Sequence, residues 1–104
     1  MKVKTIDVQA KEYFDKSGGN SYFSAQVTVN YGMKSEKVLY LPLQYGYDNH
    51  YETMTMKKLI DEGIIKADTR KQLYRYCEEN NIILRSNKET NCKKREVVSF
   101  GSEN

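Results

Sequence analysis

Two stretches of alternating polar and apolar residues, joined by a short turn, constrain the fold of this chain more than any other feature. In residues 2–14 and again in 21–31, most residues at every second position are apolar. This period of two is typical of half-buried strands. The turn between them reads Asp15-Lys16-Ser17-Gly18-Gly19-Asn20. Its glycines tolerate positive φ, and its Asp, Ser and Asn side chains can hydrogen-bond locally. We therefore predict an antiparallel hairpin.

The same alternation predicts the register of this hairpin. With Phe14 opposite Ser21, three apolar pairs meet on one face: Ala10 with Ala25, Val8 with Val27, and Ile6 with Val29. A slip by one residue would set apolar side chains against polar ones, so the pattern favours this register alone. It also places Tyr13 opposite Tyr22 on the outer face.

A third strand is expected over residues 36–47, with its leucines and Tyr45 pointing inward. Pro42 has no N–H to donate, so this strand must be an edge strand or carry a bulge. A three-stranded antiparallel meander with the second strand in the centre satisfies that constraint.

The second half reads as helices and short strands. We expect helices over Thr53–Glu62, ended by Gly63, and over Thr69–Asn80, with Asp68 as N-cap. A strand follows over Ile82–Leu84, then a polar loop over Arg85–Asn91 and a last strand over Glu96–Phe100.

The predicted class is α+β, in which the antiparallel meander packs against two short helices. In one arrangement the C-terminal strands extend the meander. The chain forms one domain, 1–104. Its parts are a meander (1–47), two helices (52–80), C-terminal strands with a basic loop (81–100) and a frayed tail (101–104). A core of this size is thin, and a homodimer would add buried area.

Composition excludes several classes of protein. The chain has 104 residues, a net charge of +3 and 30% charged residues, a balance typical of soluble globular domains. No apolar run approaches the roughly 20 residues of a membrane-spanning helix. No Cys/His cluster suits a zinc site and no glycine motif suits a phosphate, so we expect neither metal nor cofactor. Cys77 and Cys92 are expected to be free thiols in a reducing cytosol.

The first candidate site is the outer face of the meander, which would carry aromatic and polar side chains: Tyr13, Tyr22, Ser24, Gln26 and Tyr40. Tyrosine is enriched at protein interfaces, so this face is a candidate partner-binding surface. In one alternative, the tyrosines only stabilise the sheet through cross-strand pairs. In another, a second subunit or the segment Glu96–Phe100 covers the face. The loop Tyr47–Tyr51 is the next candidate.

The second candidate site is a cluster of five cations: Arg85, Lys88, Lys93, Lys94 and Arg95. With Glu89 they give residues 85–95 a net charge of +4, which would attract a nucleic-acid backbone. The alternative is a solvated loop without a ligand.

Catalysis is the third candidate. His50 lies between Asp48 and Tyr51 in the sequence and could act as a general base. Cys92 precedes Lys93, which could lower the pKa of its thiol. Neighbouring residues of one loop rarely converge on a substrate, and no nucleophile is evident for His50. We therefore do not expect an enzyme.

Four segments resemble a family of small uncharacterised proteins encoded by bacteriophages and prophages. They are Lys11–Lys16 (KEYFDK), Gly19–Ser24 (GNSYFS), Tyr40–Tyr47 (YLPLQYGY) and, more loosely, Cys92–Val98 (CKKREVV). The third block of that family ends in Gln-Tyr-Gly-Tyr-Gly, and Asp48 stands here in place of the last glycine. The resemblance implies a phage or prophage origin and an accessory role in the host bacterial cytoplasm. It identifies no site.

Accessory phage proteins of this size often inhibit host defence, as anti-CRISPR proteins do, or modulate host transcription and replication, and they commonly act by stoichiometric binding. The resemblance therefore implies a protein that binds a host protein complex, with a defence nuclease as one candidate. The chain is not strongly acidic, which argues against a DNA mimic. The alternative function is a small nucleic-acid-binding domain that uses the sheet tyrosines and the basic loop.

Overall fold

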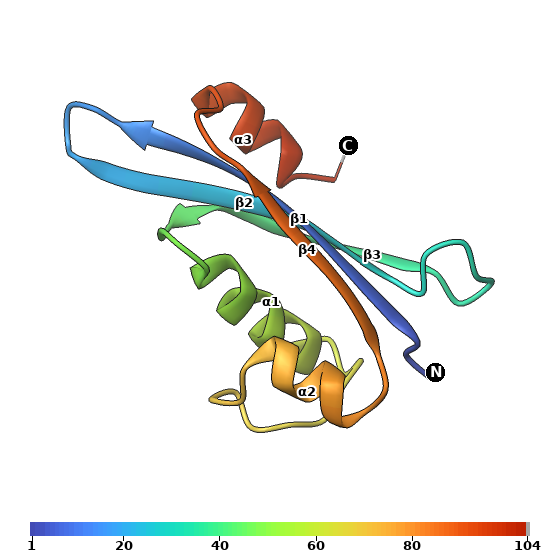
Figure 1. Cartoon of the computed structure of the whole chain (residues 1–104). Helices are drawn as coiled ribbons and strands as arrows, with labels where there is room; N and C mark the ends of the chain where they lie inside the picture. The colour runs from blue at the N-terminus through green and yellow to red at the C-terminus, as the bar shows by residue number, and fades with distance from the viewer. Residues whose placement is uncertain (104) are drawn as a thin grey trace.

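The computed structural model, which describes residues 1–103, is a mixed α+β structure with a four-stranded sheet between layers of helix (Figure 1). Its elements in chain order are β1 (Thr5–Asp15), β2 (Asn20–Val29), β3 (Lys37–Tyr45), α1 (His50–Asp61), α2 (Leu73–Glu79), β4 (Ile83–Glu89) and α3 (Lys94–Phe100). The strand order is β3-β2-β1-β4. The predicted meander is confirmed, with a fourth strand added beside β1.

The register of the β1–β2 hairpin is confirmed along its length. Its pairs are Ile6 with Val29, Val8 with Val27, Ala10 with Ala25, Tyr13 with Tyr22, and Phe14 with Ser21. The alternating apolar residues of both strands form the inner face, and α1 and α2 cover it. Val27, Met56 and Leu59 are almost fully buried there. The same alternation also predicts Phe14 and Tyr31 on this face, but both side chains are exposed.

The third strand follows one part of the prediction and departs from another. As Pro42 required, β3 is an edge strand, and its pairing with β2 is irregular beside Phe23 and Ala25. Leu41 lies opposite Ala25, but Gln44 lies opposite Phe23, so β3 spans three residues where β2 spans two. This bulge reverses the alternation. Tyr45, predicted to point inward, therefore lies opposite Tyr22 on the outer face.

The predicted polar loop Arg85–Asn91 is wrong, because most of it forms β4, which pairs with β1 in parallel. A strand of such polarity is tolerated since it lies at the sheet edge and its cations have partners. Arg85 lies opposite Asp7 and bonds to its carboxylate, and Lys88 bonds to the carboxylate of Glu12 at 2.9 Å.

The predicted last strand Glu96–Phe100 is also wrong, because these residues form α3. Glu96 accepts a hydrogen bond from the backbone N–H of Lys93 at 3.2 Å, which stabilises the start of a helix. Val97 then falls on the buried side of that helix. Gly101, predicted to fray, is buried behind α3; Asn104, at the end of the predicted tail, lies outside the described residues.

The two other helices differ from prediction at their starts. Helix α1 begins at His50 rather than Thr53 and ends before Gly63, whose φ is +72°. Helix α2 begins at Leu73 rather than Thr69. Asp68 caps no helix, because α2 begins only at Leu73 with Gln72 as its N-cap. The Asp68 carboxylate instead accepts hydrogen bonds from the backbone N–H and the guanidinium of Arg70 in the turn before the helix. Within residues 1–103, none of the helices is long and apolar enough to cross a membrane.

Candidate functional site

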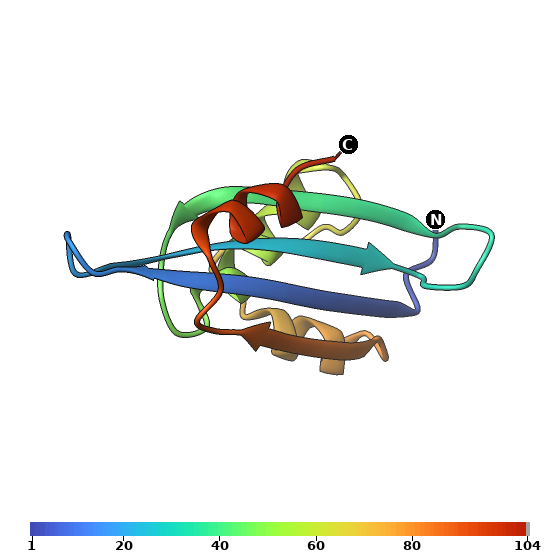
Figure 2. The same cartoon turned by 90° about the horizontal axis from the view of Figure 1, so that it is seen from above.

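Helix α3 lies across the outer face of the sheet, on the side opposite α1 and α2 (Figures 1 and 2). Two side chains of β2 hold it there. Ser24 Oγ donates a hydrogen bond to the carbonyl of Val97 at 2.6 Å, and Gln26 Nε2 donates one to the carbonyl of Phe100 at 3.1 Å. Both carbonyls belong to the last turn of the helix. The carbonyl of Val97 also accepts from the backbone N–H of Gly101 at 3.2 Å, whereas Gln26 satisfies an acceptor at Phe100 that the helix itself leaves open.

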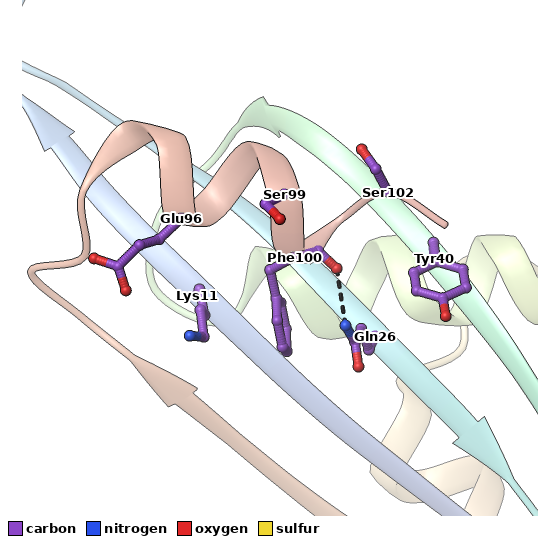
Figure 3. A pocket seen from close by; sticks show the side chains of 7 residues that line it. All are labelled: Lys11, Gln26, Tyr40, Glu96, Ser99, Phe100 and Ser102. Carbon is purple, nitrogen blue, oxygen red and sulfur yellow. Dashed lines mark hydrogen bonds between the residues drawn. The ribbon is translucent and has the colours of Figure 1, made fainter. Parts of the chain in front are cut away.

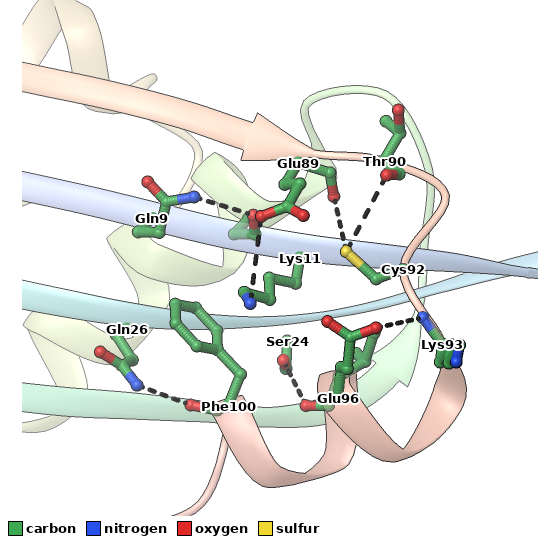
Figure 4. A network of polar contacts seen from close by, with 12 residues as sticks. Gln9, Lys11, Ser24, Gln26, Glu89, Thr90, Cys92, Lys93, Glu96 and Phe100 are labelled. Carbon is green, nitrogen blue, oxygen red and sulfur yellow. Dashed lines mark hydrogen bonds and ion pairs between the residues drawn. The ribbon is translucent and has the colours of Figure 1, made fainter.

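Further contacts tie the same helix, and the segment that leads into it, to β1 (Figure 4). Lys11 Nζ lies 5.0 Å from the centroid of the Phe100 ring and 3.9 Å from the carboxylate of Glu89. The backbone N–H of Cys92, in the segment that leads into α3, donates to the carbonyl of Glu12 at 2.9 Å. The middle of the outer face is therefore covered by α3 of the same chain.

The five residues of the first candidate site are divided by this helix. Ser24 is fully buried beneath α3, and Gln26 is partly buried and bonded to it. Tyr40 lines an open hollow of about 410 Å³ beside α3, together with Lys11, Gln26, Glu96, Ser99, Phe100 and Ser102 (Figure 3). Tyr13 and Tyr22 lie towards the hairpin end of β1 and β2. The C-terminal segment Glu96–Phe100 therefore covers the middle of the outer face, which is one of the alternatives drawn from the sequence.

Four tyrosine rings form a continuous chain at the hairpin end of the sheet. The ring centroids of Tyr13 and Tyr22 are 5.4 Å apart in a stacked pair, those of Tyr22 and Tyr45 are 5.9 Å apart, and those of Tyr45 and Tyr47 are 6.4 Å apart. We call these four residues the tyrosine surface. Tyr45 is 55% exposed and Tyr47 is 59% exposed, so the surface is open to solvent at this end.

A hollow of about 380 Å³ lies next to the tyrosine surface. It is lined by Tyr45, Gly46, Tyr47, Asp48, Asn49, His50 and Thr53, and we call it the loop hollow. Its backbone is packed tightly at Gly46, where a Cβ would lie 2.6 Å from the Phe23 ring and 2.8 Å from the His50 ring. Only glycine fits there.

The basic cluster of the second candidate site is split between two elements. On β4, the guanidinium of Arg85 bonds to Asp7, which raises the pKa of Arg85 further above its ordinary value. Lys88 Nζ bonds to Glu12 and, at 2.6 Å, to the carbonyl of Asp48. Lys93, Lys94 and Arg95 lie at the start of α3 and are exposed.

The residues considered for catalysis do not converge. The hydroxyl of Tyr51 lies 3.0 Å from Ser86 Oγ, whereas the ring of His50 packs edge-on against Phe23. Burial raises the pKa of the Cys92 thiol, which is the direction opposite to that of an activated cysteine. Among residues 1–103, no group of three or more His, Cys, Asp or Glu side chains is placed to hold a metal ion.

Comparisons with known proteins give this chain no counterpart: no protein-family model, curated protein or solved structure matches it. What points to function is therefore the chemistry of its own surface.

Proposed function

We propose that this protein is a phage or prophage accessory protein that acts without catalysis, by stoichiometric binding to a host protein complex through its tyrosine surface. The observation that carries the proposal is the chain of four tyrosine rings at the hairpin end. Tyrosine brings a large rigid area and a hydroxyl to an interface at a small cost in side-chain entropy. Inhibition of a defence complex such as a CRISPR nuclease is one role that the resemblance implies, and modulation of host transcription or replication is another.

The arrangement of the rings supports binding over a purely structural role. One stacked pair, Tyr13 with Tyr22, is an ordinary cross-strand contact that stabilises a sheet. Tyr45 and Tyr47 add two more rings that leave over half of their surface in water. The apolar core, which lies on the other face of the sheet, includes neither of these two side chains.

The proposal is tested by capture of partners from the bacterial host with tagged protein. The variant is Tyr45→Ala. The matched control is Tyr31→Ala, which removes a tyrosine that is 69% exposed, against 55% for Tyr45, from the turn after β2, at the other end of that strand. We expect Tyr45→Ala to weaken partner affinity about 30-fold, the equivalent of about 2 kcal/mol at a hot spot. Tyr31→Ala should bind as the original protein does. Equal capture by both variants would contradict the proposal.

A nucleic-acid-binding domain is the second candidate function, and one observation favours it. Lys93, Lys94 and Arg95 are consecutive and exposed at the start of α3. They are the members of the basic cluster that lie outside the ion pairs of β4. A phosphate backbone could contact all three.

A further inference from the structure

The loop hollow combines aromatic faces with one carboxylate. Tyr45 and Tyr47 line it with rings inclined at 73° to each other, so that the rings point in different directions. The face of an aromatic ring carries partial negative charge and attracts cations. Arginine exploits such a face better than lysine does, because its planar guanidinium also stacks on the ring.

The charge of the hollow favours the same kind of ligand. Asp48 carries the only formal charge among its lining residues if His50 is neutral. The Asp48 side chain is exposed, and within residues 1–103 its carboxylate takes part in none of the ion pairs. Lys88 bonds to the backbone carbonyl of Asp48, but the carboxylate of Glu12 balances the charge of that lysine. The charge of the hollow is therefore complementary to a cation rather than to an anion.

The loop that lines the hollow is also held in place by packing and by a backbone hydrogen bond. The contact of Gly46 with Phe23 and His50 leaves no room for a side chain, which holds the loop against the core. The backbone N–H of His50 donates to the carbonyl of Tyr47 at 3.1 Å, so the loop leads directly into α1. The side chains of Asn49 and Thr53 add acceptors that guanidinium N–H groups could use. A volume of about 380 Å³ is ample for a guanidinium and its methylenes.

We infer that the loop hollow binds the guanidinium of an arginine side chain on the partner protein. The guanidinium plane stacks on one of the two tyrosine rings, Tyr45 or Tyr47, and the Asp48 carboxylate pairs with its charge. A stacked nucleic-acid base is disfavoured at this place, because the lining contains no lysine or arginine to hold the adjoining phosphate. The inference rests on the proposed function only in assigning the arginine to a protein partner.

The inference is tested on the full chain with a defined probe, the peptide acetyl-Gly-Gly-Arg-Gly-Gly-amide, titrated by NMR. Its analogue with citrulline in place of arginine has the same shape without the charge. We expect saturable shifts at Tyr45, Tyr47 and Thr53 with the arginine peptide, and affinity about fivefold lower for the citrulline peptide. Asp48→Asn should lower the affinity for the arginine peptide about fivefold as well. The matched control Asp61→Asn, at the end of α1, should leave it unchanged.

The inference is overturned by equal binding of the two peptides, by shifts away from the loop hollow, or by an unchanged affinity in Asp48→Asn. Oligothymidylate that bound at the same residues in place of the peptide would overturn it in favour of base stacking. The proposed function is tested separately by the capture experiment. Loss of capture in Tyr45→Ala without binding of the arginine peptide would remove this inference and leave the proposed function standing. Peptide binding without any captured partner would do the reverse.

Discussion

Val27 and Thr28 are neighbours on β2 whose side chains have opposite environments. Val27 is fully buried in the core beneath α1 and α2, whereas Thr28 points to the outer face and is partly exposed. Val27→Asp should cost about 3–5 kcal/mol in unfolding free energy, because it buries an unpaired charge. Thr28→Asp should cost less than about 1 kcal/mol. Thermal melts of the two variants check this, and equal losses would contradict the assignment of faces.

Cys77 makes the stability of the protein sensitive to alkaline pH. Burial in the core raises the pKa of its thiol from an ordinary value of 9.0 to about 11. Between these two values the unfolded chain loses the thiol proton while the folded protein keeps it, so deprotonation favours unfolding. The stabilisation is complete below pH 9 and is lost as the pH rises towards 11.

The measurement is the free energy of unfolding at several pH values from 8 to 11, for the original protein and for Cys77→Ala. The variant should be less stable at pH 8, because it leaves a cavity, but its stability should fall less steeply above pH 9. Parallel curves for the two proteins would show that Cys77 does not titrate in this way.

The C-terminal end of helix α3 also makes a close backbone approach to the sheet. A Cβ on Gly101 would lie 2.5 Å from the carbonyl oxygen of Leu41 and 2.6 Å from the Cβ of Ser24. Gly101→Ala should therefore lift the end of α3 from the sheet and cost about 1–3 kcal/mol. Ser99→Ala, on the exposed side of the helix, is the control and should cost much less. Denaturant unfolding measures both, and equal stability of the two variants would mean that α3 does not pack at Gly101.

At the level of elements, the sequence predicts structure well where one face is buried and the other is not. The β1–β2 hairpin meets this condition, so its period and its register could both be predicted from alternating residues such as Val8 and Val27. The pattern fails in β4, whose charged side chains are satisfied by partners on β1 far away in the sequence. It fails in Glu96–Phe100 because the β-branched pair Val97-Val98 favours a strand, whereas the bond between Glu96 and the Lys93 N–H favours a helix.

The candidate site, like the fold, could be predicted only in part. Tyr13 and Tyr22 follow from the hairpin register. The face on which Tyr45 lies could not be predicted. Pro42 indicates an irregularity in the strand, but it does not indicate which residues change face. Ser24 and Gln26 were expected to face a partner, and their partner is α3 of the same chain. Gly101, which has no side chain and follows a short apolar segment, is a sequence signal for the close packing of α3 on the sheet. That signal can be interpreted only with the structure.

On the scale of the whole molecule, the cations are distributed unevenly. Arg85 and Lys88 are paired on β4, while Lys93, Lys94 and Arg95 gather at the start of α3. If a nucleic acid binds, Lys93→Ala with Lys94→Ala should weaken binding and reduce the slope of log affinity against log salt by about 2. Retention on mixed DNA and RNA at several salt concentrations measures this. No retention of the original protein at low salt would eliminate the nucleic-acid function.

The two edges of the sheet are protected by different means. Pro42 and the bulge interrupt β3, and β4 carries three charged side chains, Arg85, Lys88 and Glu89. Both devices discourage the addition of a further strand from another molecule. If the homodimer expected from the small core forms, a face of the protein is therefore a better contact than an edge.

The parallel pairing of β1 with β4 also sets the order in which the molecule can fold. β1 meets β2 across a tight turn, but Asp7 and Arg85, which face each other across β1 and β4, are 78 positions apart in the chain. Local hairpins close within microseconds, whereas distant pairings must first overcome the entropy of a long loop. During synthesis the hairpin can form early, but the outer edge of β1 stays unpaired until residues 83–89 have left the ribosome. For that interval the nascent chain presents an open strand edge to its neighbours, so the speed with which residues 83–89 emerge bears directly on how much of the protein escapes aggregation.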